Sequence, residues 1–230
     1  MKPITVFCAY FLLLSPMNAL AQTEISVGID SKYVTEGRDN LPQGGIIWTG
    51  FNHAMNEHWS IHALYGVAAN DKVSYDELNV TIAYQNTINQ VDYVIGITQL
   101  AFFKDKISDT EVSVDMVAFQ EGVISPYVNL LYSIEQAGLF SEVGIQKGVA
   151  LHELWFVTPY IGAAFDNGYT GSLQSGFNNF RVGTQQAFNV SADIAVNAIF
   201  EQSFGGAVIK NEAENRQNIF WFGMHVVMTF

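Results

Sequence analysis

The last strand-length segment of the chain alternates between two kinds of side chain. One parity is bulky and apolar throughout: Phe220, Phe222, Met224, Val226, Met228 and Phe230. The other parity is mixed: Trp221, Gly223, His225, Val227 and Thr229. A period of two predicts a β-strand, because successive side chains of a strand point to opposite faces. This strand therefore has one face that needs an apolar environment, and the sequence ends on a phenylalanine of that face.

Eleven further segments have similar lengths and predict strands, whereas no apolar segment after residue 21 has the length of a membrane-spanning helix. The twelve predicted strands cover residues 24–36, 45–55, 58–69, 76–86, 91–102, 111–120, 126–136, 139–148, 154–165, 177–187, 190–201 and 218–230. A tilted strand needs about nine to eleven residues to cross a bilayer. Short and long links largely alternate, which is typical of membrane barrels. We expect an all-β fold, an antiparallel transmembrane β-barrel with twelve strands, or with ten if two links that fit less well are misassigned.

Aromatic residues gather at the predicted strand ends. One end carries Trp59, Tyr84, Tyr93, Trp155, Phe188 and Phe230 on the apolar parity, and the other carries Tyr33, Phe165, Phe180, Phe200 and Phe220. Two belts of rings are expected where a barrel meets the two membrane interfaces. A β-sandwich would instead place such rings in one central core. The belts therefore favour outer-membrane lipid as the surroundings of the barrel.

The first 21 residues have the pattern of a secretory signal peptide. Lys2 supplies a positive start, Ile4 to Leu14 form a short apolar stretch, and Ala19-Leu20-Ala21 is a cleavage site between small residues. We expect residues 1–21 to be removed and residues 22–230 to form the barrel. The single cysteine, Cys8, lies within the signal, so the mature chain has neither disulfides nor thiolate chemistry.

The sequence resembles bacterial outer-membrane proteins in three places. The final strand resembles the C-terminal targeting strand that the barrel-assembly machinery reads. Residues 31–37 (Ser-Lys-Tyr-Val-Thr-Glu-Gly) resemble the Ser-x-Tyr-Val-x-Arg-Gly opening of an uncharacterised proteobacterial outer-membrane barrel family, with Glu36 in the place of its arginine. Residues 159–162 (Pro-Tyr-Ile-Gly) are similar to a stretch of many small outer-membrane barrels. The resemblance implies the outer membrane of a Gram-negative bacterium and assembly through the last strand, and it implies no particular activity.

Charged residues on the inward parity indicate an acidic lumen. Without Lys2, nine Lys and Arg stand against twenty-two Asp and Glu, a formal charge of −13, which argues against nucleic acid as a partner. The predicted lumen residues are Asp30, Lys32, Glu36, Glu77, Asp92, Glu111, Asp115, Arg181, Asp193 and Glu201, with Glu24, Glu135 and Glu142 on the same parity. They predict either a paired polar network in a structural barrel or a narrow passive channel for small polar or cationic solutes. Strand number leaves both open, because about eight strands fill their interior and about sixteen enclose an aqueous channel.

Two other functions remain as alternatives. A two-residue turn at Asn56-Glu57 would place His53 across from Ser60 on one face, a base beside a nucleophile for a lipid hydrolase. No oxyanion donor accompanies this pair, so we expect no enzyme activity. The barrel could instead bind a surface partner through its outer loops. His58 and His62 stand too far apart along a strand to chelate one metal, and we expect neither a metal site nor a cofactor.

Overall fold

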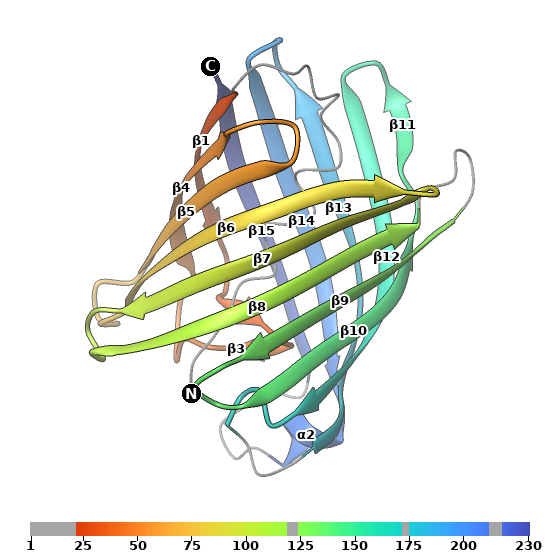
Figure 1. Cartoon of the computed structure of the whole chain (residues 1–230). Helices are drawn as coiled ribbons and strands as arrows, with labels where there is room; N and C mark the ends of the chain where they lie inside the picture. Colours follow the sequence, from red (N-terminus) through yellow and green to blue (C-terminus); the bar gives the residue numbers. More distant parts are fainter. Residues whose placement is uncertain (1–21, 119–123, 172–174, 212–217) are drawn as a thin grey trace.

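The computed structural model describes residues 22–118, 124–171, 175–211 and 218–230, so the predicted signal peptide lies outside the described residues. Twelve antiparallel strands form a closed barrel (Figure 1). They are β1 (Thr23–Asp30), β4 (Ile46–Ala54), β5 (Trp59–Ala68), β6 (Asp76–Ile88), β7 (Val91–Phe102), β8 (Ile107–Ala118), β9 (Ser125–Ser133), β10 (Gly138–Gln146), β12 (Trp155–Asn167), β13 (Ser175–Asn189), β14 (Ile194–Gly205) and β15 (Asn218–Thr229). The predicted fold class and the strand number of twelve are confirmed. Among the described residues, no helix is both long and apolar enough to cross a membrane.

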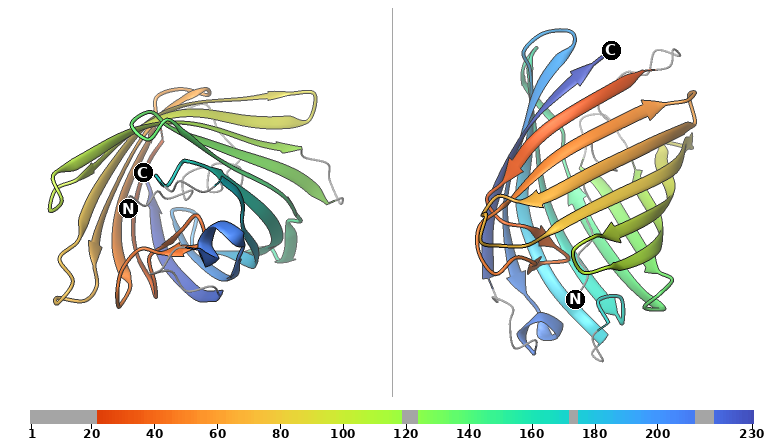
Figure 2. Two further views of the ribbon diagram at one scale, coloured as in Figure 1. Left: turned by 90° about the horizontal axis from the view of Figure 1, so that it is seen from below. Right: turned by 90° about the vertical axis from the view of Figure 1, so that its left-hand side faces the viewer.

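Each barrel strand pairs with its neighbours in the chain, and two pairings close the ring. β1 pairs with β15, for example at Val27–Val226, and β10 pairs with β12 at Gly144–Gly162. β11 (Val149–His152) is a short extra strand that pairs with the start of β12. The strands run at a steep slant around the wall (Figure 2). The sheet thus has no free edge along the barrel, because its first and last strands pair with each other.

The two faces of the wall have opposite character. Every second residue of a strand faces outward, and these positions carry exposed apolar residues such as Val27, Ile82 and Ile97. Inward positions carry buried polar groups, such as Thr81, Asn129 and Glu201. A soluble protein buries its apolar face, whereas a barrel in lipid exposes it and encloses the polar one. This arrangement explains the period-two pattern of the sequence.

The two ends of the barrel differ in their connections. The end that carries Thr23 and Phe230 has the links 55–58, 89–90, 119–124, 147–154 and 190–193. The opposite end has 31–45, 69–75, 103–106, 134–137, 168–174 and 206–217, which include the longest links. We call them the terminus end and the loop end. In membrane barrels the longer loops are extracellular, so we expect the loop end to face the outside.

The first predicted strand, 24–36, is wrong in its second half. β1 ends at Asp30, and the chain from Ser31 to Gly45 folds back into the barrel. We call residues 31–45 the lumen loop; it contains the two-residue strands β2 (Val34–Thr35) and β3 (Arg38–Asp39). Glu36 and Gly37 form its turn with φ of 47° and 73°, a conformation that ends a strand. The barrel wall continues only at β4.

Other predicted boundaries move by a few residues. The predicted strand 190–201 is observed as β14, 194–205, so Asp193 lies in a turn. The predicted strand 111–120 begins earlier, at Ile107, and its residues 119 and 120 lie outside the described part. The tight predicted link at Gln136 to Gly138 is confirmed as a turn in which Ala137 has φ of 52°. Periodicity alone does not show where a strand stops, because loop residues can continue the alternation by chance.

Hydrophobic clusters fill the lumen near the loop end. Tyr33 and Leu41 of the lumen loop pack with Ile46 and Trp48 of β4, and Tyr75 packs at the edge of this cluster. A second cluster contains Leu100, Phe102, Leu131, Phe140, Ala164 and Tyr169. The short helix α2 (Ala207–Lys210) buries Val208 and Ile209 beside β13. The loop end of the lumen is therefore largely packed.

Candidate functional site: the polar wall of the lumen

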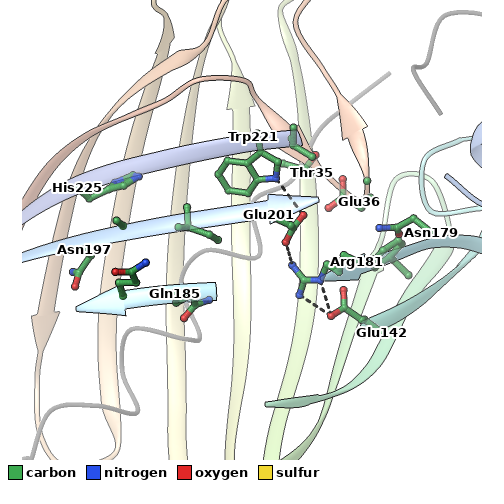
Figure 3. A pocket seen from close by; sticks show the side chains of 16 residues that line it. Thr35, Glu36, Glu142, Asn179, Arg181, Gln185, Asn197, Glu201, Trp221 and His225 are labelled. Carbon is green, nitrogen blue, oxygen red and sulfur yellow. Dashed lines mark hydrogen bonds and ion pairs between the residues drawn. The ribbon is translucent and has the colours of Figure 1, made fainter. Parts of the chain in front are cut away.

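A band of hydrogen-bonded side chains crosses six adjacent strands on the inner wall, one residue from each strand. Its members are Tyr127 (β9), Glu142 (β10), Tyr160 (β12), Arg181 (β13), Glu201 (β14) and Trp221 (β15). We call this set the lumen band. Figure 3 shows its central part, where the Arg181 guanidinium lies between two carboxylates. The band exists because all six residues lie on the inward parity of neighbouring strands at a similar height.

On one side of Arg181, the carboxylate of Glu142 receives several donors. Arg181 Nη2 lies 2.6 Å and Nε 2.9 Å from Glu142 Oε1. The hydroxyl of Tyr127 donates to the same oxygen at 2.6 Å. Such charge-assisted hydrogen bonds are stronger than neutral ones.

On the other side, Glu201 is held in the same way. Arg181 Nη1 and the Tyr160 hydroxyl both donate to Glu201 Oε2, at 3.0 and 2.6 Å. The indole Nε1 of Trp221 donates to Glu201 Oε1 at 3.2 Å. The guanidinium carbon of Arg181 lies 5.2 Å from the centre of the Tyr160 ring, within range of a cation–π interaction. Two acidic side chains thus share one cation and three neutral donors.

Glycines leave room for the large rings of the lumen band. A Cβ at Gly162 would overlap the Tyr127 hydroxyl, and a Cβ at Gly144 would overlap the same ring. At Gly183 a Cβ would overlap the hydroxyl of Tyr160. The two tyrosines therefore lie along the wall over glycines of neighbouring strands, and their hydroxyls reach the carboxylates from the side.

The lumen loop is held to the wall by three sets of contacts. The Tyr33 hydroxyl donates to Glu77 Oε2 at 2.5 Å, and Tyr75 donates to the same oxygen. Arg38 Nη2 forms a buried ion pair with Asp166 Oδ2 at 3.3 Å. The Asn178 amide donates to the Glu36 carbonyl at 2.7 Å, from a bulge in β13. Burial, and then the charge of Glu77, raise the pKa of Tyr33, so its hydroxyl stays protonated as a donor.

A cavity lies between the lumen loop and the wall formed by β13, β14 and β15. It contains about 850 Å³ of empty space, part of it open to solvent. Its lining is mixed: Val34, Thr35, Glu36, Gly37, Phe140, Glu142, Asn179, Arg181, Gln185, Gln186, Asn197, Ala198, Ile199, Glu201, Trp221 and His225. Among these residues Arg181 is the one Lys or Arg side chain. Figure 3 shows the polar members around this space.

The predicted lumen residues divide between the strands, the lumen loop and one turn. Glu77, Glu111, Asp115, Arg181 and Glu201 lie on inward strand positions, where all but Asp115 and Arg181 are fully buried. Asp30 ends β1 and binds His225 Nε2 at 2.9 Å and Trp48 Nε1 at 2.7 Å. Asp92 stays near the terminus end, where Thr87 donates to it at 2.7 Å.

Three of the predicted positions are not in strands of the wall. Lys32 and Glu36 belong to the lumen loop, and Lys32 pairs with Asp39 of the same loop at 3.0 Å. The prediction that Lys32 reaches across the lumen is wrong. Asp193 is exposed in the turn between β13 and β14, where its carbonyl accepts from the Thr229 amide at 2.9 Å.

The remaining acidic side chains have neutral partners. Tyr169 donates to Glu111 Oε1 at 3.0 Å. The Asn129 amide donates to Asp115 Oδ1 at 3.2 Å in the orientation of its oxygen and nitrogen that satisfies both neighbours. In the described part of the chain, no group of three or more His, Cys, Asp or Glu could hold a metal ion. The interior is acidic in composition, and most of its carboxylates accept hydrogen bonds, although Glu111 Oε2 is buried without a partner among the described residues.

The predicted pairing of His53 with Ser60 is wrong. The turn between β4 and β5 is one residue longer than expected, so Ala54 pairs with Ser60 and His53 pairs with Ile61. A shift of one residue moves a side chain to the other face, and His53 stacks on outward-facing Phe51. Ser60 instead contacts His62 on its own strand, at 2.8 Å. The geometry on which the hydrolase hypothesis rested is absent.

The aromatic belt at the terminus end has the expected geometry. Trp59 and Tyr84 have ring centres 5.1 Å apart, and Tyr84 and Tyr93 follow at 6.3 Å. Trp155 is exposed beside β13, and Phe230 is the most exposed large apolar residue among those that the structure describes. Tyr33 was predicted to belong to the opposite belt, and this is wrong, because its side chain lies inside the barrel and is 1% exposed. Phe165, Phe200 and Phe220 face outward as predicted.

Sequence reasoning missed the tyrosines of the lumen band and the role of Arg38. Tyr127 and Tyr160 lie on the inward parity, but aromatic residues suggested lipid contact rather than a hydrogen bond to a carboxylate. The glycines at 144, 162 and 183 were the signal that could have identified them, because a glycine on the inward face leaves room for a large neighbour.

An apolar outer surface, a polar interior and a closed ring of twelve strands define the class of this protein: a porin-like outer-membrane β-barrel. No protein-family model and no curated protein matches the sequence. Solved structures share the fold. The KdgM porin in complex with disordered oligogalacturonate aligns with a TM-score of 0.61 and 6% identity, over 91% of this chain and 99% of that chain.

Two further structures agree with this assignment. The NanC porin has a TM-score of 0.56 and 7% identity, over 90% of this chain and 98% of that chain. An outer membrane channel from Pseudomonas putida F1 has a TM-score of 0.56 and 8% identity, over 93% and 97%. At such identities the likeness concerns the fold alone, and the fold places the chain among outer-membrane barrels.

Proposed function

We propose that this protein is a narrow passive channel for small polar or cationic solutes. The observation that carries the proposal is the cavity beside the lumen band, whose mixed lining includes three glutamates and which adjoins the lumen loop and extends along β13, β14 and β15. Hydrogen-bonding groups on a lumen wall replace part of the hydration of a passing solute. The porin-like fold is consistent with such a role.

The charges around the cavity favour cations over anions. Glu36, Glu142 and Glu201 line it, and the one guanidinium among the lining residues is paired with two of these carboxylates. An anion would meet net negative charge in a wall of low dielectric constant, where repulsion is strong. The oligogalacturonate of the KdgM complex is an acidic sugar chain, and the lumen of this protein is poorly suited to such a ligand.

Planar-bilayer recordings test the channel. The purified protein should produce ionic current. Under a KCl gradient, its reversal potential should lie closer to the equilibrium potential of potassium than to that of chloride. Replacing Glu142 and Glu201 together by Gln leaves Arg181 unpaired and should shift the reversal potential toward chloride. Absence of current would contradict the proposal and favour a structural barrel, and chloride selectivity of the native protein would contradict the role of the acidic wall.

We also propose that the barrel-assembly machinery recognises the last strand. Its outward face is apolar along its length, and Phe230 at its end is exposed. In cells, Phe230→Ser should lower the amount of heat-resistant folded barrel in the outer membrane, whereas Phe220→Ser at the other end of the strand should have a smaller effect. Equal assembly of the native chain and Phe230→Ser would contradict this recognition.

A further inference from the structure

One oxygen of the Glu142 carboxylate receives no hydrogen bond from the described residues. The donors Arg181 Nε, Arg181 Nη2 and the Tyr127 hydroxyl all bind the other oxygen, Oε1. Figure 3 shows Oε2 turned away from the guanidinium. Glu142 is 4% exposed but lines the cavity, so a molecule in the cavity can reach this oxygen. A carboxylate oxygen largely removed from bulk water attracts a cation that donates a hydrogen bond to it.

The second glutamate of the lumen band differs from Glu142 in this respect. Glu201 Oε2 accepts from Arg181 and Tyr160, and Glu201 Oε1 accepts from the Trp221 indole. Both glutamates line the same cavity and share the same guanidinium. We therefore expect a ligand to contact Glu142 directly and to be attracted by Glu201 only through its charge.

The negative charge around the cavity exceeds what Arg181 neutralises. One guanidinium stands against three carboxylates in the lining, a formal charge of −2 with His225 neutral; the three are Glu36, Glu142 and Glu201. Asp115 adds a carboxylate outside the lining, because it lies level with Glu142 on β8, with Asn129 of β9 between them. An excess of one sign inside a wall of low dielectric constant raises the local concentration of the opposite sign.

The remainder of the lining suits an organic cation better than a metal ion. Within the described ranges no group of three or more His, Cys, Asp or Glu could hold a metal, and Ca²⁺ takes about six to eight oxygen ligands. Phe140 lies two residues before Glu142 on the same face of β10, roughly 7 Å along the strand. Further apolar side chains line the same space: Val34, Ala198, Ile199 and Trp221. A cation with a hydrocarbon part has favourable surroundings for both of its parts.

We propose that the cavity binds small organic amines in their protonated form, with Glu142 Oε2 as the acceptor for the ammonium group. The inference rests on the proposed function and specifies the class of its solute. A primary ammonium group carries N–H donors and no acceptor, as the lysine side chain does, so it complements a carboxylate oxygen that has no donor. The hydrocarbon part of the amine lies against the apolar lining beside Phe140.

A set of four matched probes separates the three features of such a ligand. n-Butylammonium has the charge, the N–H donors and the hydrocarbon chain. n-Butyltrimethylammonium lacks the N–H donors, n-butanol lacks the charge, and the ammonium ion lacks the chain. Titration calorimetry on the full-length mature barrel in detergent at low salt should show saturable binding of n-butylammonium. The other three probes should bind about tenfold more weakly or less, because each lacks one contact.

Two variants that remove the same charge separate direct contact from long-range attraction. Glu142→Gln should weaken n-butylammonium binding about tenfold or more, the effect of losing a hydrogen bond to a charged group. Glu201→Gln also removes one carboxylate from beside Arg181, but it should weaken binding only about threefold, since it removes no contact with the ligand. Glu24→Gln removes a charge outside the cavity lining and should leave binding unchanged. Circular dichroism should show the β-sheet of the native barrel in all three variants.

Equal losses in Glu142→Gln and Glu201→Gln would overturn the proposal, because they would show attraction by overall charge alone. Equal affinity of the native barrel for n-butylammonium and n-butyltrimethylammonium would overturn it as well, and this comparison needs no variant to fold. Amine binding without ionic current would contradict the channel and support the site. Potassium-selective current without amine binding would contradict the site alone.

Discussion

Arg181 contacts two carboxylates that lie on different strands, and its hydrogen bonds explain how an acidic lumen can be stable. Glu142 and Glu201 are nearly fully buried, and a buried carboxylate without partners is strongly unfavourable. The sequence indicated which charges of the wall strands face inward, because parity determines the face of a strand, but it did not show that Lys32, Glu36 and Asp193 lie outside those strands. It did not indicate which of them pair, because pairing depends on strand order and on the relative height of residues far apart in the chain.

Removing the positive charge of the lumen band should destabilise the barrel. In Arg181→Met, Glu142 and Glu201 lose their shared cation while remaining buried, and breaking a buried ion pair costs about 3–5 kcal/mol. Equilibrium unfolding by urea in lipid vesicles measures the change. The triple variant Arg181→Met/Glu142→Gln/Glu201→Gln should recover most of the loss. A stability of Arg181→Met equal to that of the native barrel would show that the pair contributes little.

Outward positions respond to charge in the opposite way. Val80 on β6 is 39% exposed on the apolar face. If the residue lies near the bilayer midplane, Val80→Arg should lower the free energy of unfolding by about 2–4 kcal/mol. The same urea titration measures this cost. Asp71→Arg, in the exposed link 69–75, serves as the control and should change stability by less than about 0.5 kcal/mol. A negligible cost at Val80 would contradict its contact with lipid.

At the scale of elements, the sequence predicted the barrel strands well and the lumen loop poorly. Alternation continues from Ile29 through Tyr33, so residues 31–36 resembled a continuation of β1. The positive φ of Glu36 and the burial of Tyr33 depend on contacts with Glu77 and Asn178, which lie elsewhere in the chain. The β4–β5 turn shows the same limit, because one extra turn residue turned His53 to the outside.

Shortening the lumen loop should widen the passage through the loop end. Replacing residues 33–42 by a short Gly-Ser linker removes the Tyr33–Glu77 bond and the Arg38–Asp166 ion pair. Single-channel conductance should rise, while β-sheet circular dichroism should be retained because the wall strands are unchanged. A control that shortens the exposed turn 103–106 should leave conductance as it was. Unchanged conductance in the lumen-loop variant would show that this loop does not limit the flow.

For the whole molecule, the surroundings of the four tryptophans follow from the inside–outside division. Trp59 and Trp155 are 44% and 40% exposed on the outer surface, whereas Trp48 and Trp221 are 2% and 5% exposed inside. In single-tryptophan variants reconstituted with brominated phospholipid, fluorescence should be quenched at positions 59 and 155 and largely retained at 48 and 221. Equal quenching at all four positions would contradict the membrane orientation of the wall.

The closed ring was predictable from strand count and alternation, whereas the state of its interior was not. Twelve strands enclose a lumen that side chains can either line or fill. The packing of Tyr33, Leu41 and Tyr169 fills the loop end, and these residues come from loops whose paths no local pattern specifies.

The glycines beneath Tyr127 and Tyr160 influence the width of the lumen, because they let these rings lie flat along the wall. A single methyl group at position 162 would push the Tyr127 phenol off the wall and toward the axis of the barrel, because the atoms that it would meet belong to side chains; at position 183 it would also meet the backbone carbonyl of Phe200 on β14. Homologous barrels could thus change which molecules they admit through one-codon exchanges between glycine and alanine, while the scaffold that the membrane surrounds stays the same.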